Sequence, residues 1–161
     1  MVREILFRAK RLDNDEWVMG FYMSLGGKYH YILTGKLNII CGYPDLVKYQ
    51  VDPATVGQYT GMKDKHGKRI FEGDLLDGFQ YPFFREENNA HNYFAEVVWF
   101  DDSPAFGLVT HRHPLSAVRG ISAGNAEYME EFDPNDWGVI GNIYDNPELL
   151  GNERREDNHD C

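Results

Sequence analysis

The side chains best suited to metal chemistry in this sequence are two histidines separated by one residue. His111 and His113 flank Arg112, and in an extended segment residues two apart point to the same side. Two imidazoles on one side can supply two ligands of a zinc or other transition-metal site, which then needs a further ligand brought in by the fold. The alternative is a surface loop that carries two histidines.

A second pair of chemically useful groups is Glu72 and Asp74. Because they are two residues apart, a strand places both carboxylates on one face, where they can hold a divalent cation or transfer protons. The simpler interpretation is a bulge at Gly73 flanked by two solvated acids. The sequence contains no phosphate-cradling glycine loop, GxSxG elbow, paired CxxC or HExxH motif. We therefore favour a protein that is not an enzyme and expect no catalytic residue, metal or cofactor.

The charge of the chain bears on its partners. The formal net charge is −10, from 26 acidic and 16 basic residues, and a negative field repels a phosphate backbone. Nucleic acid is therefore disfavoured unless positive charge is concentrated locally. One concentration lies near the start of the chain, and the other is the central cluster Lys63, Lys65, Lys68 and Arg69. These are either edge and turn charges that discourage aggregation or contacts to phosphate.

A run of aromatic residues is the other candidate for an interaction surface. It lies in a long segment without strand pattern, residues 77–92, and contains Phe79, Tyr81, Phe83 and Phe84. A cluster of exposed aromatic side chains is expected to be buried, either against the core of the same domain or against a neighbouring subunit. Together with the four basic residues of the central cluster, they form our candidate interaction surface.

The elements that must position these residues are mostly strands. Hydrophobic residues make up 42% of the chain and aromatic residues 14%, and alternating patterns predict a β-rich protein with short helical turns. Asp64-Lys65-His66-Gly67 predicts the turn of a central hairpin. Outside that hairpin, strands are expected at residues 3–10, 17–24, 28–34, 35–41, 47–51, 93–100, 105–110 and 137–144.

Several segments between these strands carry more local predictions. Gly26-Gly27 predicts a tight hairpin turn, and residues 52–55 and 146–150 predict short helical turns. Tyr43-Pro44-Asp45 is expected to break the strand at 35–41, in which Cys41 is predicted to be a packed, inert thiol. Residues 123–132 are consistent with a short acidic helix.

The sequence also bears on location. No segment approaches the ~20 consecutive apolar residues of a membrane span, and no basic-then-apolar signal peptide opens the chain. Cys161 is the last residue of a polar tail, so a framework disulfide with Cys41 is not expected. We expect a cytoplasmic protein that has no membrane partner.

Three ordered motifs resemble one protein family. They are REILFRAK with EWVMGFY near the start, QYTG with DKHGK and EGD at residues 58–74, and VIGNIYDNPELL at residues 139–150. Together they are similar to the YopX-like proteins of phages and prophages, a family without an agreed molecular activity. The organisation expected is an amino-terminal β-hairpin region at 1–56, a core at 57–150 and a mobile tail at 151–161. The strand order of the core is similar to that of a small bent SH3-like barrel.

The resemblance, the aromatic excess and the absent catalytic motifs favour a phage or prophage accessory protein that acts through protein contacts. Its expected partners are further copies of itself, in a homo-oligomer, or a host or phage protein. One alternative is a nucleic-acid-binding module that uses the Lys63, Lys65, Lys68 and Arg69 cluster. The other is a metal-dependent enzyme that uses His111, His113 and nearby acids.

Overall fold

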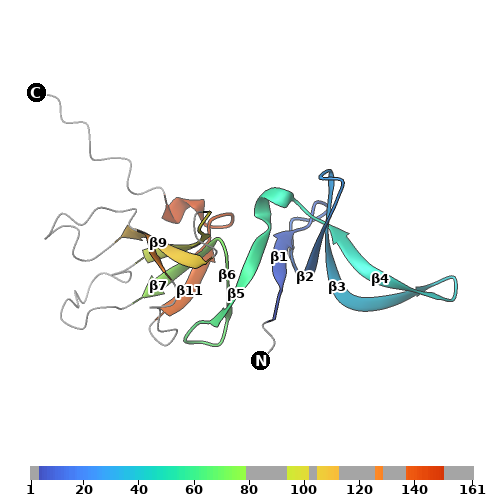
Figure 1. Ribbon diagram of the computed structural model, residues 1–161, viewed down its shortest axis with the longest axis horizontal. Helices are drawn as coiled ribbons and strands as arrows, with labels where there is room; N and C mark the ends of the chain where they lie inside the picture. Colours follow the sequence, from blue (N-terminus) through green and yellow to red (C-terminus); the bar gives the residue numbers. More distant parts are fainter. Residues whose placement is uncertain (1–3, 79–93, 102–104, 113–125, 129–136, 151–161) are drawn as a thin grey trace, which may run out of the picture. The chain divides into compact units, whose positions relative to one another are not determined.

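Antiparallel strands make up most of the described chain, so the mainly β class predicted from the sequence is confirmed (Figure 1). The computed structural model describes residues 4–78, 94–101, 105–112, 126–128 and 137–150. The chain separates into residues 1–61 and residues 62–161, which we call unit 1 and unit 2. Among the described residues, no helix is long and apolar enough to cross a membrane.

Unit 1 contains the first five strands of a six-stranded sheet with the order β4-β3-β2-β1-β5-β6, whose last strand, β6, lies in unit 2. Gly26 and Gly27 both have positive φ in the turn between β2 and β3, as the Gly-Gly pair predicted. The predicted helical turn is η1, which Asp52 caps by accepting a hydrogen bond from the Ala54 N–H. The elements are β1 (Phe7–Lys10), β2 (Trp17–Leu25), β3 (Tyr29–Ile40), β4 (Tyr43–Gln50), η1 (Pro53–Thr55) and β5 (Gly57–Lys63), which continues into unit 2.

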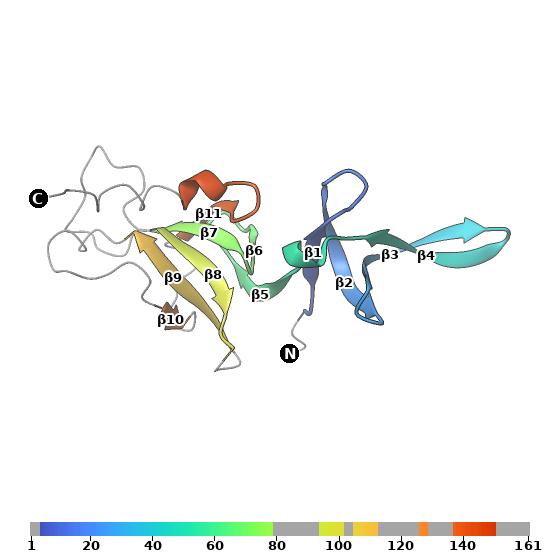
Figure 2. The same cartoon turned by 90° about the horizontal axis from the view of Figure 1, so that it is seen from above.

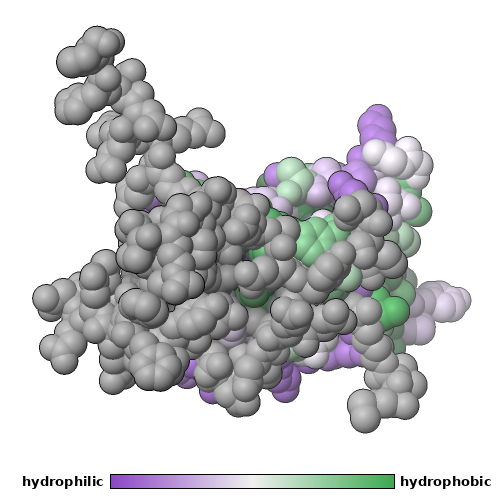
Figure 3. All heavy atoms as spheres, turned by 60° about the vertical axis from the view of Figure 1, so that its left-hand side comes forward, coloured by the Kyte–Doolittle hydropathy of each residue, from purple (hydrophilic) through white to green (hydrophobic). Residues whose placement is uncertain are grey.

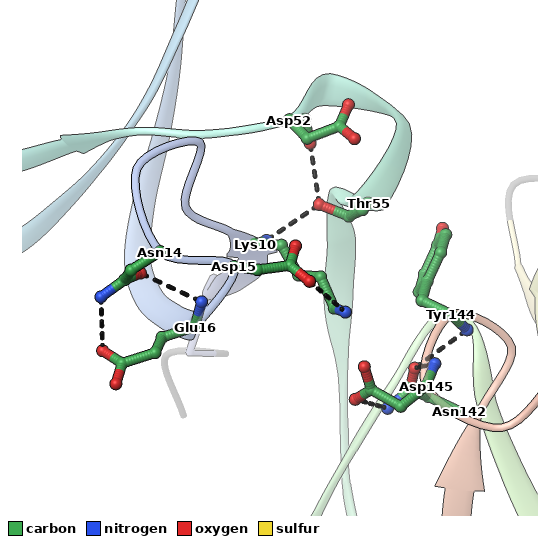
Figure 4. A network of polar contacts seen from close by, with 9 residues as sticks. All are labelled: Lys10, Asn14, Asp15, Glu16, Asp52, Thr55, Asn142, Tyr144 and Asp145. Atoms are coloured by element: carbon green, nitrogen blue, oxygen red, sulfur yellow. Dashed lines mark hydrogen bonds and ion pairs between the residues drawn. The ribbon is translucent and has the colours of Figure 1, made fainter.

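The core of unit 1 lies against one face of this sheet. In the register of β1 and β2, Ala9 lies opposite Val18, and directly opposite residues of an antiparallel pair share a face. The Thr55 hydroxyl joins β1 to η1. It accepts a hydrogen bond from the Lys10 N–H and donates one to the Asp52 carbonyl, both at 2.8 Å (Figure 4). The core comprises Ala9, Ile32 and Val51, with Phe7, Val18, Tyr22 and Val56 packed against them.

The ends of β3 and β4 form a two-stranded ribbon, residues 34–47. The pairing of β2 with β3 ends at Leu33, so the following residues of β3 pair with β4 alone, and both views show the ribbon extending from β1 and β2 (Figures 1 and 2). Two sequence predictions were wrong here. Pro44 does not interrupt strand structure but lies within β4. β4 is at the edge of the sheet, where a missing N–H is tolerated. Cys41 is exposed in the turn at the tip.

Unit 2 contains a second antiparallel sheet, with the order β10-β9-β8-β7-β11, and no closed barrel is found among the described strands. The acidic helix predicted at 123–132 was wrong for residues 126–128, which pair with β9. The helical turn predicted near the end is present as η3. The elements are β6 (Arg69–Phe71), β7 (Asp74–Gly78), β8 (Phe94–Trp99), β9 (Phe106–Arg112), β10 (Ala126–Tyr128), β11 (Trp137–Asn142) and η3 (Pro147–Leu149).

The core of unit 2 lies among these strands. Leu75 and Leu76 of β7 are both fully buried. Two of the most bulky members of the core are Phe106 and Trp137, from β9 and β11. The core comprises Ile70, Leu76, Ala95, Val97, Phe106, Leu108 and Trp137, with Met62 and Val139 packed against it.

Candidate interaction surface

The two acidic residues predicted as metal ligands differ in how deeply they are buried. Asp74 is buried at the start of β7 and accepts the Phe71 N–H at 2.8 Å, whereas Glu72 is half-buried. Asp74 therefore supports the tight turn between β6 and β7. His111 lies in β9, while its side chain and His113 fall outside the described residues. In the part of the chain that is described, no three His, Cys, Asp or Glu residues gather into a metal-binding group.

The residues predicted as an interaction surface lie around the turn between β5 and β6. Lys63, Lys65 and Lys68 are exposed, and Arg69 is half-buried at the start of β6. The aromatic residues Phe79, Tyr81, Phe83 and Phe84 lie outside the described residues.

Asp64 organises this turn through its buried carboxylate. Its Oδ1 accepts the N–H of His66 at 2.9 Å and of Lys68 at 2.8 Å, which closes the turn locally. Its Oδ2 accepts the Val139 N–H of β11 at 3.0 Å, and the Lys65 N–H donates to the Trp137 carbonyl at 3.0 Å. The turn is thus fastened to β11, across a separation of 75 residues.

These hydrogen bonds also set the ionisation of Asp64. Burial acts to raise the pKa of its carboxyl group, but the N–H groups of Val139, Lys68 and His66, with the nearby His66 ring, outweigh burial and lower the pKa below its ordinary value. The carboxylate is therefore charged at neutral pH. A charged carboxylate that accepts three backbone hydrogen bonds in this position is a structural anchor.

A second internal anchor joins the turn before β7 to the end of β11. Gly73 has φ of +79°, donates to the Val97 carbonyl at 2.8 Å and accepts the Ile143 N–H at 2.9 Å. The Asn142 Oδ1 then accepts the N–H groups of Tyr144 and Asp145, which folds the chain after β11 into a tight turn (Figure 4). The predicted bulge residue Gly73 is thus a link within unit 2.

Among the described residues, most exposed large apolar side chains belong to unit 1. Of the 13 large hydrophobic residues described as exposed, 11 belong to unit 1, and only Trp99 and Ile140 belong to unit 2. Figure 3 shows hydrophobic residues, in green, at the surface of the described part. Scattered exposed hydrophobic residues are normal, whereas contiguous ones mark interaction surfaces.

On the ribbon these side chains are contiguous and occupy both faces. Leu37 lies opposite Leu46 and Ile39 opposite Pro44, which makes one apolar face. Ile40 lies opposite Tyr43 on the other face. The exposed fractions reach 78% for Ile39 and 76% for Tyr43. Sequence reasoning missed this surface because the strand was expected to end before Pro44, although the alternation of Leu37 with Ile39 was a signal for it.

Comparison with known proteins places the chain in a family. The YopX protein family matches residues 6–151. The chain belongs to the YopX family. The crystal structure of protein EF1440 from Enterococcus faecalis has a TM-score of 0.56, with 23% sequence identity, and the match covers 92% of this chain and 99% of that chain. At that identity the similarity shows the fold alone. No curated protein matches the chain.

The YopX signature segments of unit 2 correspond to the two anchors described above. The DKHGK motif contains Asp64, the EGD motif contains Gly73, and the terminal motif supplies Val139 and Asn142. Their observed contacts are with each other and with the strands of unit 2. These motif residues therefore maintain the fold of unit 2 in this chain, and the exposed apolar surface of unit 1 is the better candidate for its interactions.

Proposed function

We propose that this YopX-family protein is a non-enzymatic accessory protein of a phage or prophage that acts through protein contacts in the cytoplasm of its bacterial host. The ribbon of β3 and β4 is the observation that carries the proposal. It offers partners the exposed side chains Leu37, Ile39, Ile40, Tyr43 and Leu46.

The physical support is the cost of leaving such a ribbon uncovered. A two-stranded hairpin is marginally stable in water, and none of the described strands pairs with this one as a third strand beyond Leu33. Contact with a partner would remove apolar side chains of the ribbon from water and stabilise the ribbon. A contiguous exposed apolar surface is typical of a protein-interaction site. A site that binds phosphate instead carries cations.

Sedimentation of the fluorescently labelled full chain in an extract of the bacterial host, compared with buffer, tests the proposal. We expect the protein to sediment as a complex heavier than the monomer, and the substitution Ile39→Lys to shift it towards the monomer. A charge at a 78% exposed position does not disturb the core but must be desolvated in an apolar contact.

The matched control is Ile5→Lys, which adds the same charge at an exposed position of unit 1 outside the ribbon. We expect this variant to sediment as the unsubstituted protein does. Monomeric sedimentation of both the unsubstituted chain and Ile39→Lys in the extract would refute a function through protein contacts.

A further inference from the structure

Strand β2 carries apolar side chains on both faces. Its even-numbered positions Val18 and Tyr22 pack against the core of unit 1. Its odd-numbered positions form an unbroken apolar row of Trp17, Met19, Phe21, Met23 and Leu25. A sheet with one solvated face normally alternates apolar with polar residues, so this second apolar row is typical of a strand that is covered on both faces.

The second row is open in the isolated chain. Phe21 is 62% exposed, while Met19 and Leu25 are each 49% exposed. The core members Ala9, Val18 and Ile32 all fall on the opposite face by register. On β2 and β3, unit 1 therefore has one packed face and one apolar face that the described core residues do not cover.

The open face continues onto β3 and the ribbon. Phe21 lies opposite Leu33, and Leu25 lies opposite Tyr29, so the face crosses from β2 to β3. On β4, Lys48 pairs with Leu33 and Leu46 pairs with Leu37, and residues 46 and 48 share a face because they are two apart. The exposed apolar members of this open face are Met19, Phe21, Leu25, Tyr29, Leu37, Ile39 and Leu46.

The size of the open face matches a dimer interface. At about 200 Å² for a fully exposed large apolar residue, the seven members expose about 800 Å². The largest apolar patch on a typical monomer is ~300–600 Å². A standard interface buries roughly 800 Å² on each partner, which this face supplies alone.

We infer that the open face of unit 1 binds the same face of a second copy of this chain, so that two sheets pack face to face as a sandwich. This inference names the partner for the protein contacts proposed above and rests on that proposal. A two-fold axis makes the contact self-complementary, since the same rows of side chains meet from both copies. Apolar sheet faces pack in this way at about 10 Å separation.

The distribution of charge favours a second copy. By register, the cations of this face lie on the strands next to its apolar rows: Arg8 and Lys10 on β1, and Lys48 on β4. Arg8 and Lys10 lie over the Trp17 ring, at 4.8 Å and 5.7 Å from its centroid. The apolar rows of β2 and β3 carry no charge, so two copies that meet over these rows bury no unpaired charge there. Arg8 is already buried beside Trp17 in the single chain.

The edge of the sheet disfavours the other common mode of self-association. β4 is the edge strand, and strand addition would have to pair with its free backbone groups. Pro44 lies within β4 and has no N–H to donate to an added strand. Contact through the face is therefore the mode that this sheet supports.

Sedimentation equilibrium of the purified full chain, at micromolar concentration and at low and moderate salt, tests the inference. We expect a dimer whose mass does not change with salt. Phe21→Glu places a charge in the centre of the face and should weaken dimerisation on the order of 100-fold. Leu12→Glu is the matched control, because Leu12 is 58% exposed in the turn outside β2, and it should leave the dimer unchanged.

A second variant guards against loss of folding in Phe21→Glu. Leu37→Lys lies on the ribbon, beyond the β2 pairing, and should also weaken the dimer while circular dichroism stays unchanged. A purified wild-type monomer would overturn the inference, as would a dimer unaffected by both variants. If the purified chain is monomeric but forms the heavier complex in host extract, another protein is the partner and the proposed function stands without this inference.

Discussion

The Asp64→Ala substitution removes the carboxylate that joins the turn between β5 and β6 to β11. Three backbone N–H groups lose their acceptor, those of His66, Lys68 and Val139. The turn is itself exposed at Lys65 and His66, so water can replace part of what is lost there. The bond to Val139 is different, because it joins segments 75 residues apart and no neighbouring turn residue can substitute for it.

The magnitude follows from the three bonds taken separately. A hydrogen bond to a charged acceptor is worth about 1.5–3 kcal/mol, and less where water reaches the donor. We assign about 1 kcal/mol to each turn bond and about 2 kcal/mol to the Val139 bond, which gives about 4 kcal/mol in total. That is a large fraction of the roughly 5–15 kcal/mol that stabilises a typical domain.

The pH dependence has a definite sign. Because the pKa of Asp64 is lower in the folded protein than in the unfolded chain, the charged carboxylate stabilises the fold above the unfolded pKa. This contribution is lost as the pH falls through the folded pKa. The difference in stability between wild type and Asp64→Ala should therefore be full at pH 7 and shrink below about pH 4, near the pKa of an unperturbed aspartate.

Urea unfolding followed by tryptophan fluorescence measures the change, since Trp137 lies in the core of unit 2. Asp52→Ala is the control, because Asp52 caps η1 through a single exposed bond, whose loss should cost about 1 kcal/mol. If Asp64→Ala costs no more than this control, or if its cost does not change with pH, the anchoring role assigned to Asp64 is refuted.

Two further predictions concern glycines of unit 2. Gly73→Ala should lower the free energy of unfolding by about 1 kcal/mol more than Gly67→Ala does. Both glycines have φ of +79°, but only at Gly73 would a Cβ press on the Tyr144 ring, at 3.2 Å. Equal unfolding midpoints of the two variants in urea would contradict this. Gly141→Ala would press its Cβ against the Asn146 Oδ1. We therefore expect the costs of Gly141→Ala and Asn146→Ala to be non-additive in a double-mutant cycle, because removing the Asn146 side chain relieves part of the clash. Additive costs would show that the close approach is relieved in another way.

Local chemistry was sufficient to predict the features that depend on neighbours in sequence. Gly26-Gly27 predicted the turn between β2 and β3, and Asp52-Pro53 predicted the cap of η1, because left-handed glycine and a capped proline turn need no distant partner. Alternation predicted the mainly β class. The separated motifs predicted the family, which the match over residues 6–151 confirms.

Predictions failed where a distant strand overrides a local preference. Residues 126–128 have the composition of a helix but pair with β9, and the pairing decides their conformation. Pro44 looked like the end of a strand, yet an edge strand needs no N–H on its outer side, and nothing in the local sequence shows that β4 lies at an edge.

The sequence by itself determined which residues are apolar along β2 and the ribbon, and which acids and glycines stand at the turns. Only the tertiary structure decided which of them are buried. The register turns Val18 and Tyr22 into the core and leaves Phe21 open, and Asp64 becomes an anchor because β11 returns to it from far along the chain. The physical reason is that alternation defines two faces of a strand, whereas the packing of other strands determines which face is removed from water.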